Sequence, residues 1–143
     1  MRRANDTPKK ARPAERDYSH RLLLDKLGVK QGQKIAVHAI EDSVFLADLA
    51  SRVPDFSRDS FPNQADIIFF GAQDAGKLDR LDTMAKSIQK NGAIWVVYPK
   101  GQKHIREVEV IAAGKSAGLT DNKVCKFSET HTALRFVIPL AKR

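Results

Sequence analysis

Segment 71–77, with the sequence GAQDAGK, has the glycine and lysine spacing of a loop that binds nucleotide phosphates. In such loops a Ser or Thr directly after the lysine coordinates magnesium. Leu78 stands at that position here, and it fits the apolar face of a following helix. We therefore predict a strand-to-helix turn capped by Asp74, with Lys77 exposed, and no nucleoside triphosphate site. Anion binding by the amides at the start of the helix is the alternative that this pattern leaves open.

The histidine and cysteine side chains give little support for metal or nucleophile chemistry. His20, His38, His104 and His131 have none of the HxH or HxxxH spacings that place two ligands on one metal ion. His38 is predicted to be a core histidine with satisfied hydrogen bonds. Cys125 is the single cysteine, which excludes an internal disulfide and a zinc site built from several cysteines. We expect it to be packed rather than reactive.

A better candidate site lies at the end of the apolar run 94–98, where Pro99 and Lys100 follow. Ligands of open α/β sheets bind beyond the carboxyl ends of the strands. The proline restricts the path of the chain, and the lysine suits an anionic small molecule. We expect Lys100 to share a concavity with at least one residue of segment 129–131. The candidate ligand-binding residues are Lys100, Glu129, Thr130, His131, Lys123 and Arg135, the last two depending on the face that strand alternation gives them.

The turn after the first predicted strand argues against a nucleotide cofactor. Dinucleotides and S-adenosylmethionine need glycines there, because the backbone approaches the ligand closely. Segment 38–43, HAIEDS, contains no glycine, and Asp59 is only a weak candidate for holding a ribose. We therefore predict no cofactor.

These candidate residues lie on a predicted series of alternating strands and helices. The run 94–98, IWVVY, shows no polar alternation, which is typical of a strand covered on both faces. The last two strands are joined by six residues, which allows an antiparallel pair and excludes a crossover. The predicted fold is α/β: a Rossmann-like, mostly parallel sheet with helices on both faces and a closing antiparallel strand pair, resembling a truncated class I methyltransferase. The predicted strands span 34–40, 66–70, 94–98, 123–127 and 134–138, with a weak one near 55–58, and the predicted helices lie near 22–27, 42–53, 74–88 and 104–117.

Composition and charge set the predicted limits of this domain. The 143 residues carry a formal net charge of +8, and much of it lies near the two ends. Residues 1–16 are polar, with two prolines, and are predicted to form a flexible basic arm ahead of a single α/β domain over 17–143. We further expect nonspecific contact with nucleic acid through this arm, because its basic side chains suit phosphates. No apolar run approaches the ~20 residues of a membrane helix, and no secretory signal is evident, so we expect a cytoplasmic protein.

Three segments together resemble the DUF3052 family of small bacterial proteins. They are 27–32 (LGVKQG), 92–100 ending in Tyr-Pro-Lys, and 123–125 (KVC) followed by 129–137 (ETHTALRFV). The family pattern has Trp-Pro-Lys where Tyr98 begins the motif here, and Glu-Thr-Trp where His131 ends it. The resemblance implies a Rossmann-like or methyltransferase-like fold over about residues 20–140, and no established activity.

Three hypotheses for function follow. The first is a non-catalytic binding or regulatory module, because no acid–base or nucleophile constellation is evident. The second is a binder of an anionic small molecule, or an enzyme, that uses the carboxyl ends of the strands. The third is a weak nucleic-acid binder that acts through the basic tails.

Overall fold

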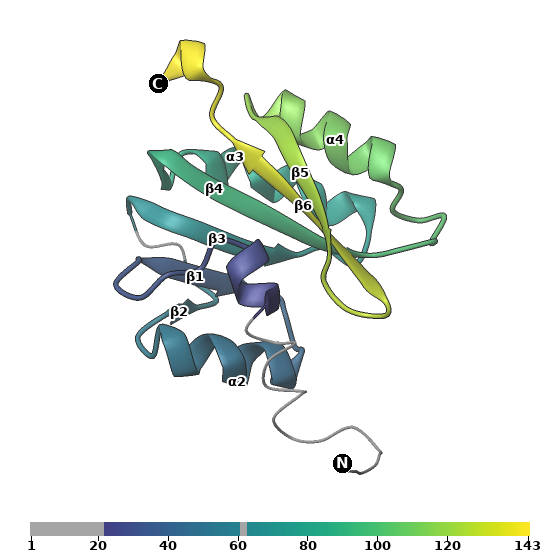
Figure 1. Cartoon of the computed structure of the whole chain (residues 1–143). Coiled ribbons are helices and arrows are strands. Elements are labelled where there is room, and N and C mark those ends of the chain that lie inside the picture. The colour runs from purple at the N-terminus through teal and green to yellow at the C-terminus, as the bar shows by residue number, and fades with distance from the viewer. Residues whose placement is uncertain (1–21, 61–62) are drawn as a thin grey trace, which may run out of the picture.

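A six-stranded sheet forms the centre of the molecule, with the strand order β2-β1-β3-β4-β6-β5 (Figure 1). The computed structural model describes residues 22–60 and 63–143, so the predicted arm, the start of the predicted domain and His20 lie outside the described residues. The first four strands in this order are parallel, β6 is antiparallel to β4, and β5 is antiparallel to β6. The predicted fold class is confirmed. The strands are β1 (Ile35–His38), β2 (Ser57–Arg58), β3 (Ala65–Gly71), β4 (Ile88–Pro99), β5 (Thr120–Lys126) and β6 (His131–Val137).

Helices cover both faces of the sheet (Figure 1). One face packs against α2 and the short helical segment 22–26. The other packs against η1, α3 and α4. The named helices are α2 (Ser43–Arg52), the 3-10 helix η1 (Ala75–Arg80), α3 (Leu81–Ala85), α4 (Glu107–Ser116) and the 3-10 helix η2 (Leu140–Lys142).

Strand β4 is apolar along most of its length because both of its faces are covered, as predicted. Trp95 and Val97 face the α2 side, whereas Val96 and Tyr98 face the α4 side. Trp95 is fully buried, and its indole Nε1 donates a hydrogen bond of 3.0 Å to the carbonyl of Leu27. This bond satisfies the indole donor, which would otherwise be costly to bury.

Several local signals in the sequence form the helix ends that they predict. Asp42 caps α2 and accepts hydrogen bonds from the amides of Val44 and Phe45. Gly28, with φ of +79°, ends segment 22–26, and the amide of Val29 donates to the carbonyl of Leu24. That bond is the six-to-one bond of a Schellman motif.

Two predicted helices are shorter in the structure. The helix expected over 74–88 is a 3-10 turn followed by α3, which ends at Ala85. Ile88 already belongs to β4, because it pairs with Ala65 ahead of an irregularity in the β3–β4 register. The helix expected from His104 begins at Glu107, so residues 101–106 form a loop. These differences move the basic residues of that loop beside the end of β4.

Candidate functional site

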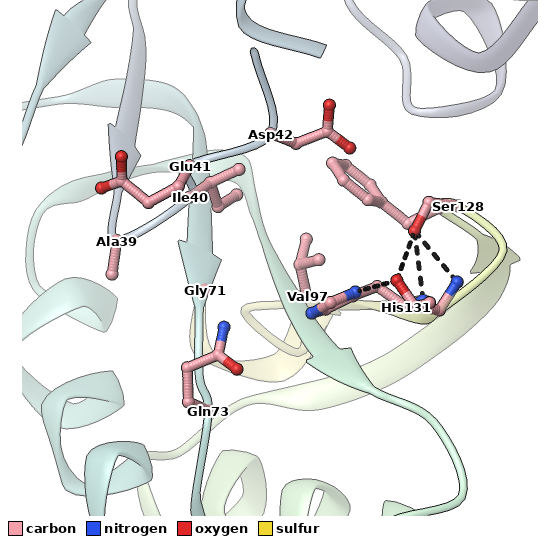
Figure 2. Close-up of a pocket in the computed structure, with 11 residues that line it drawn as sticks. Ala39, Ile40, Glu41, Asp42, Gly71, Gln73, Val97, Ser128 and His131 are labelled. Atoms are coloured by element: carbon pink, nitrogen blue, oxygen red, sulfur yellow. Dashed lines mark hydrogen bonds between the residues drawn. The ribbon is translucent and has the colours of Figure 1, made fainter. Parts of the chain in front are cut away.

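The carboxyl ends of β1 and β3 mark the point at which the strand order changes direction. From β1 the chain goes to β2 on one side, and it later returns to β3 on the other side. Open α/β sheets bind their ligands at such a switch point. A cavity of about 240 Å³ lies here, and we call it the strand-end cavity (Figure 2). Its lining residues are Ala39, Ile40, Glu41, Asp42, Gly71, Gln73, Val97, Phe127, Ser128, Thr130 and His131.

The loop from β1 to α2 forms one wall of this cavity. Ala39 has a φ of 62°, the left-handed conformation that favours glycine, so the chain turns sharply there while keeping a side chain. Ile40 is buried and contributes apolar surface. The Glu41 carboxylate turns away from the cavity (Figure 2), toward Arg58, whose Nη2 lies 3.4 Å from Glu41 Oε1.

The end of β3 fits closely against that loop. A Cβ atom on Gly71 would collide with the carbonyl oxygen of Ala39, so this position requires glycine. Two residues on, Gln73 is exposed, and its amide points toward the cavity (Figure 2). Gly71 belongs to the segment that resembles a phosphate loop in sequence. In the structure, glycine is required there because the turn after β3 packs against the loop from β1 to α2.

The β5–β6 turn forms the opposite wall and holds its polar side chains in a local network. Ser128 Oγ accepts hydrogen bonds from the amides of Thr130 and His131, at 3.3 and 3.2 Å. Thr130 Oγ1 lies 2.8 Å from His131 Nδ1. The His131 ring extends across the cavity toward Val97 and the end of β3 (Figure 2). Its other nitrogen, Nε2, makes no hydrogen bond with the residues that the structure describes.

The structure divides the predicted site residues between two cavities. The amide of Lys100 donates a hydrogen bond of 3.0 Å to the carbonyl of Thr130, so the lysine and the predicted connector are neighbours. Thr130 and His131 line the strand-end cavity, whereas Lys100 lines a different cavity of about 400 Å³. We call the latter the lysine-rich cavity. It is lined by Tyr98, Lys100, Gly101, Gln102, Lys103, Ile105, Arg106, Glu107 and Thr132.

Glu129 belongs to neither of these two cavities. Its carboxylate is exposed and pairs with Lys126 Nζ at 2.8 Å. The hydrogen bond from Lys126, and then the charges of Lys126 and Lys100, lower the pKa of the Glu129 carboxyl. Glu129 is therefore already paired on the outer side of the turn.

Lys123 and Arg135 lie opposite each other on β5 and β6, away from both cavities. Lys123 Nζ donates to the carbonyl of Lys26 at 2.9 Å, at the end of the first helical segment. Arg135 pairs with Trp95 across the β4–β6 ladder, and burial, followed by the charge of Arg143, lowers the pKa of its guanidinium. A structural role in joining β5 to segment 22–26 accounts for Lys123.

The other candidates, His38 and Cys125, lie outside both cavities. His38 Nε2 is 2.9 Å from Arg80 Nη1. Cys125 is buried, and burial raises the pKa of its thiol, although the charges of Lys26 and Lys123 oppose this effect. Among the residues that the structure describes, no three His, Cys, Asp or Glu side chains gather as a metal site would require. No described helix has the length and apolar character to cross a membrane.

Sequence reasoning missed several lining residues. Gln73 follows the phosphate-loop-like glycine, which drew attention to Lys77 instead. Phe127 was expected inside a strand, yet it begins the turn. Arg106 falls within the predicted helix near 104–117, and neither it nor Lys103 was linked to Lys100. The signal that could have found Lys103 and Arg106 is a regular spacing: from the end of the strand, basic residues recur every three positions, at 100, 103 and 106.

Comparison with known proteins identifies the family. Residues 25–140 match the family described as "Protein of unknown function (DUF3052)". This chain belongs to the DUF3052 family. The resemblance seen in the sequence is therefore confirmed. No curated protein has a matching sequence.

Several solved structures similar to this DUF3052 protein are described as methyltransferases. A SAM-dependent methyltransferase from Aquifex aeolicus has a TM-score of 0.67 at 13% identity, covering 90% of this chain and 94% of that chain. Magnesium protoporphyrin IX methyltransferase from Synechocystis PCC 6803, solved with bound SAM, has a TM-score of 0.62 at 8% identity, with coverages of 93% and 87%. Mitomycin 7-O-methyltransferase MmcR has a TM-score of 0.61 at 12% identity over 89% of this chain. The DUF3052 chain spans only 58% of the length of MmcR.

At these identities the likeness shows the fold alone, so S-adenosylmethionine must be tested against the residues present. The strand-end cavity of about 240 Å³ lies below the roughly 300–1,000 Å³ of ordinary ligand pockets. Gly71 lies so close to the Ala39 carbonyl that a Cβ atom would collide with it, and segment 38–43 has no glycine that would let a ligand approach the backbone. Asp59 follows β2, yet its Oδ1 lies 3.4 Å from the amide of Ala39, to which it is directed. These residues do not fit S-adenosylmethionine.

Proposed function

We propose that this DUF3052 protein is a non-catalytic module that binds a small molecule in the strand-end cavity. The observation that carries the proposal is the His131 ring at the switch point of the sheet. Its Nδ1 is held by the Thr130 hydroxyl at 2.8 Å, and its Nε2 faces the cavity. A fixed imidazole among apolar side chains is a typical way to orient a ligand by one hydrogen bond.

Three of the other polar groups that line the cavity already have hydrogen-bond or ion-pair partners in the fold, which favours binding over catalysis. A nucleophilic mechanism needs a nucleophile and a base within hydrogen-bond reach, and general acid–base catalysis needs a side chain that is free to exchange a proton with the substrate. Asp42 is used as the cap of α2, and Glu41 turns toward Arg58. Ser128 Oγ is used by two backbone amides of its own turn. These groups build the cavity rather than react within it.

The lining also indicates the class of ligand. Ile40, Val97 and Phe127 supply apolar surface, and the eleven lining residues include Asp42 and Glu41 but no Lys or Arg. An anion would find no counter-charge among the lining residues, because the nearby cation, Arg58, is directed to Glu41. The cavity therefore suits a single-ring molecule that is neutral or positively charged, with a polar group to meet His131 and Gln73.

An enzyme is the second candidate, and one contact favours it. Thr130 Oγ1 and His131 Nδ1 are as close as a nucleophile and its base. Such a pair needs a third group to orient the base, and Nε2 has no hydrogen-bond partner among the residues that the structure describes. A binding role explains the contact without that missing group.

A ligand screen with matched variants tests the proposal. The melting temperature should rise with neutral or cationic ring compounds, because a ligand that binds only the folded state stabilises it. The shift should be lost in His131→Ala and reduced in Gln73→Ala. Lys77→Ala, on the exposed side of η1, is the control and should keep the full shift. Equal shifts in His131→Ala and the parent would refute the assignment of the site.

A further inference from the structure

We propose that the lysine-rich cavity is a second site, which binds a small oxyanion such as a phosphate or a carboxylate group. The cavity lies at the same end of β4 as the strand-end cavity but on the opposite face of the strand. Tyr98 lines the lysine-rich cavity and faces the α4 side, whereas Val97 lines the strand-end cavity and faces the α2 side. The proposal therefore does not depend on the ligand of the first site.

The charges around this cavity are predominantly positive. Lys100, Lys103 and Arg106 line it, against a single carboxylate from Glu107. In the part of the chain that the structure describes, neither lysine ammonium forms an ion pair. Arg106 Nε lies 3.5 Å from Glu109 Oε1, a long contact between an exposed guanidinium and a half-buried carboxylate, and such a contact contributes little. A ligand with two negative charges would neutralise cations that the protein itself leaves largely unpaired.

The loop that carries these cations is held in place by backbone contacts. Gln102 and Ile105 form an isolated antiparallel bridge, and Gly101 takes a φ of 72°. The carbonyl of His104 accepts a hydrogen bond of 3.1 Å from the amide of Ala75 at the start of η1. Ile105 is fully buried beneath the loop. A fixed loop loses less conformational entropy on binding than a mobile one, which favours affinity.

A buried hydroxyl lies among the lining groups. The Tyr98 side chain is only 4% exposed, and its hydroxyl donates to Glu107 Oε1 at 3.4 Å. Desolvation and the nearby Glu107 charge raise the pKa of Tyr98 to about 12, so the phenol stays neutral and remains a donor at neutral pH. Its bond to Glu107 is long, and the same hydroxyl can turn to an oxyanion. Arg106 can meet that anion with two parallel N–H groups.

Inorganic phosphate and succinate, each at fixed ionic strength, are the probes. The parent should show a dose-dependent rise in melting temperature with at least one of them, and the stronger probe distinguishes phosphate from carboxylate chemistry. The triple variant Lys100→Ala, Lys103→Ala, Arg106→Gln should lose the effect, with affinity reduced at least about tenfold. The control triple variant Lys30→Ala, Lys90→Ala, Lys115→Ala makes the same change in charge at exposed positions outside the cavity and should bind like the parent.

Glu107→Gln supplies a change of opposite sign. Removing the negative charge should strengthen phosphate binding several-fold, because it removes repulsion and leaves a neutral amide that accepts from the Tyr98 hydroxyl less strongly. No response of the parent to either probe would overturn the proposal. So would equal losses in the two triple variants, which would mean that only net charge matters, or weaker binding in Glu107→Gln.

Discussion

The backbone amide of Lys100 donates a hydrogen bond of 3.0 Å to the carbonyl of Thr130, and this bond lies between two cavities. Pro99 pairs with His131 at the same place in the β4–β6 ladder. Because side chains alternate along a strand, the residues of one strand end serve opposite faces of the sheet. The β4 end thus contributes Val97 to the strand-end cavity and Tyr98 to the lysine-rich cavity.

Trp95→Ala should destabilise the protein by about 3–5 kcal/mol, because it leaves a large cavity in a fully buried part of β4. The parent Trp95 fluorescence should be blue-shifted and poorly quenched by iodide. Urea unfolding provides the free energy. Val124→Ala on the edge strand β5, where the side chain is 58% exposed, is the control and should stay within about 0.5 kcal/mol of the parent.

Gly114→Ala should destabilise α4, although the same change in an exposed helix gains about 1 kcal/mol. A Cβ atom at position 114 would collide with the ring of Phe136. We expect a net loss of about 1–3 kcal/mol from overpacking. The double variant Gly114→Ala, Phe136→Leu should recover part of this loss. A more stable Gly114→Ala variant would show that α4 does not pack on β6 as described.

Calorimetry should detect no stoichiometric binding of S-adenosylmethionine or NAD below about 100 μM, a limit of about −5.5 kcal/mol. The reasons are the small volume of the strand-end cavity and the lack of a glycine in the turn after β1. Ala39→Gly removes the side chain at the left-handed position and is the matched variant. Tight binding by the parent would contradict the assignment and place this protein functionally with its structural neighbours.

Tyr98 makes stability depend on pH in the alkaline range. Its pKa is about 12 in the folded protein against 10.0 for the unperturbed group, so folding favours the neutral phenol. The contribution is fully present below pH 10 and is lost as the pH rises from about 10 to 12. Urea unfolding of the parent and Tyr98→Phe should therefore differ in pH dependence only above about pH 10. A parallel decline of both proteins would contradict a buried, titrating Tyr98.

Sequence patterns predicted the fold well because they reflect local physics. The uninterrupted apolar run of β4 requires two covered faces, and Asp42 and Gly28 mark helix ends by hydrogen bonding and backbone conformation. The limits of helix and strand were less predictable. Apolar spacing fitted a helix up to Ile88, but pairing with Ala65 placed that residue in β4.

The candidate site was predicted only in part, because its place in the fold follows from local patterns and its details depend on strand register. The position of Thr130 and His131 beside the end of β4 follows from an antiparallel closing pair. Which side of β4 each residue takes depends on register, which local sequence does not determine. Hence Lys100 and at least one residue of segment 129–131 were expected in one concavity, whereas Lys100 lines one cavity and Thr130 and His131 line the other. Gln73 lines the first cavity because β3 pairs with β1, a tertiary contact that local sequence does not show.

Amide chemical shifts of labelled protein, titrated with benzamidine, benzamide and benzoate, test the central claim most directly. The three compounds share one ring and differ in charge. The account predicts that benzamidine and benzamide shift the amides of residues 39–42, 73 and 128–131, and that benzoate does not. His131→Ala should abolish these shifts. Perturbation of that group of amides by benzoate alone, or by none of the three compounds, would contradict a strand-end cavity for neutral and cationic ligands.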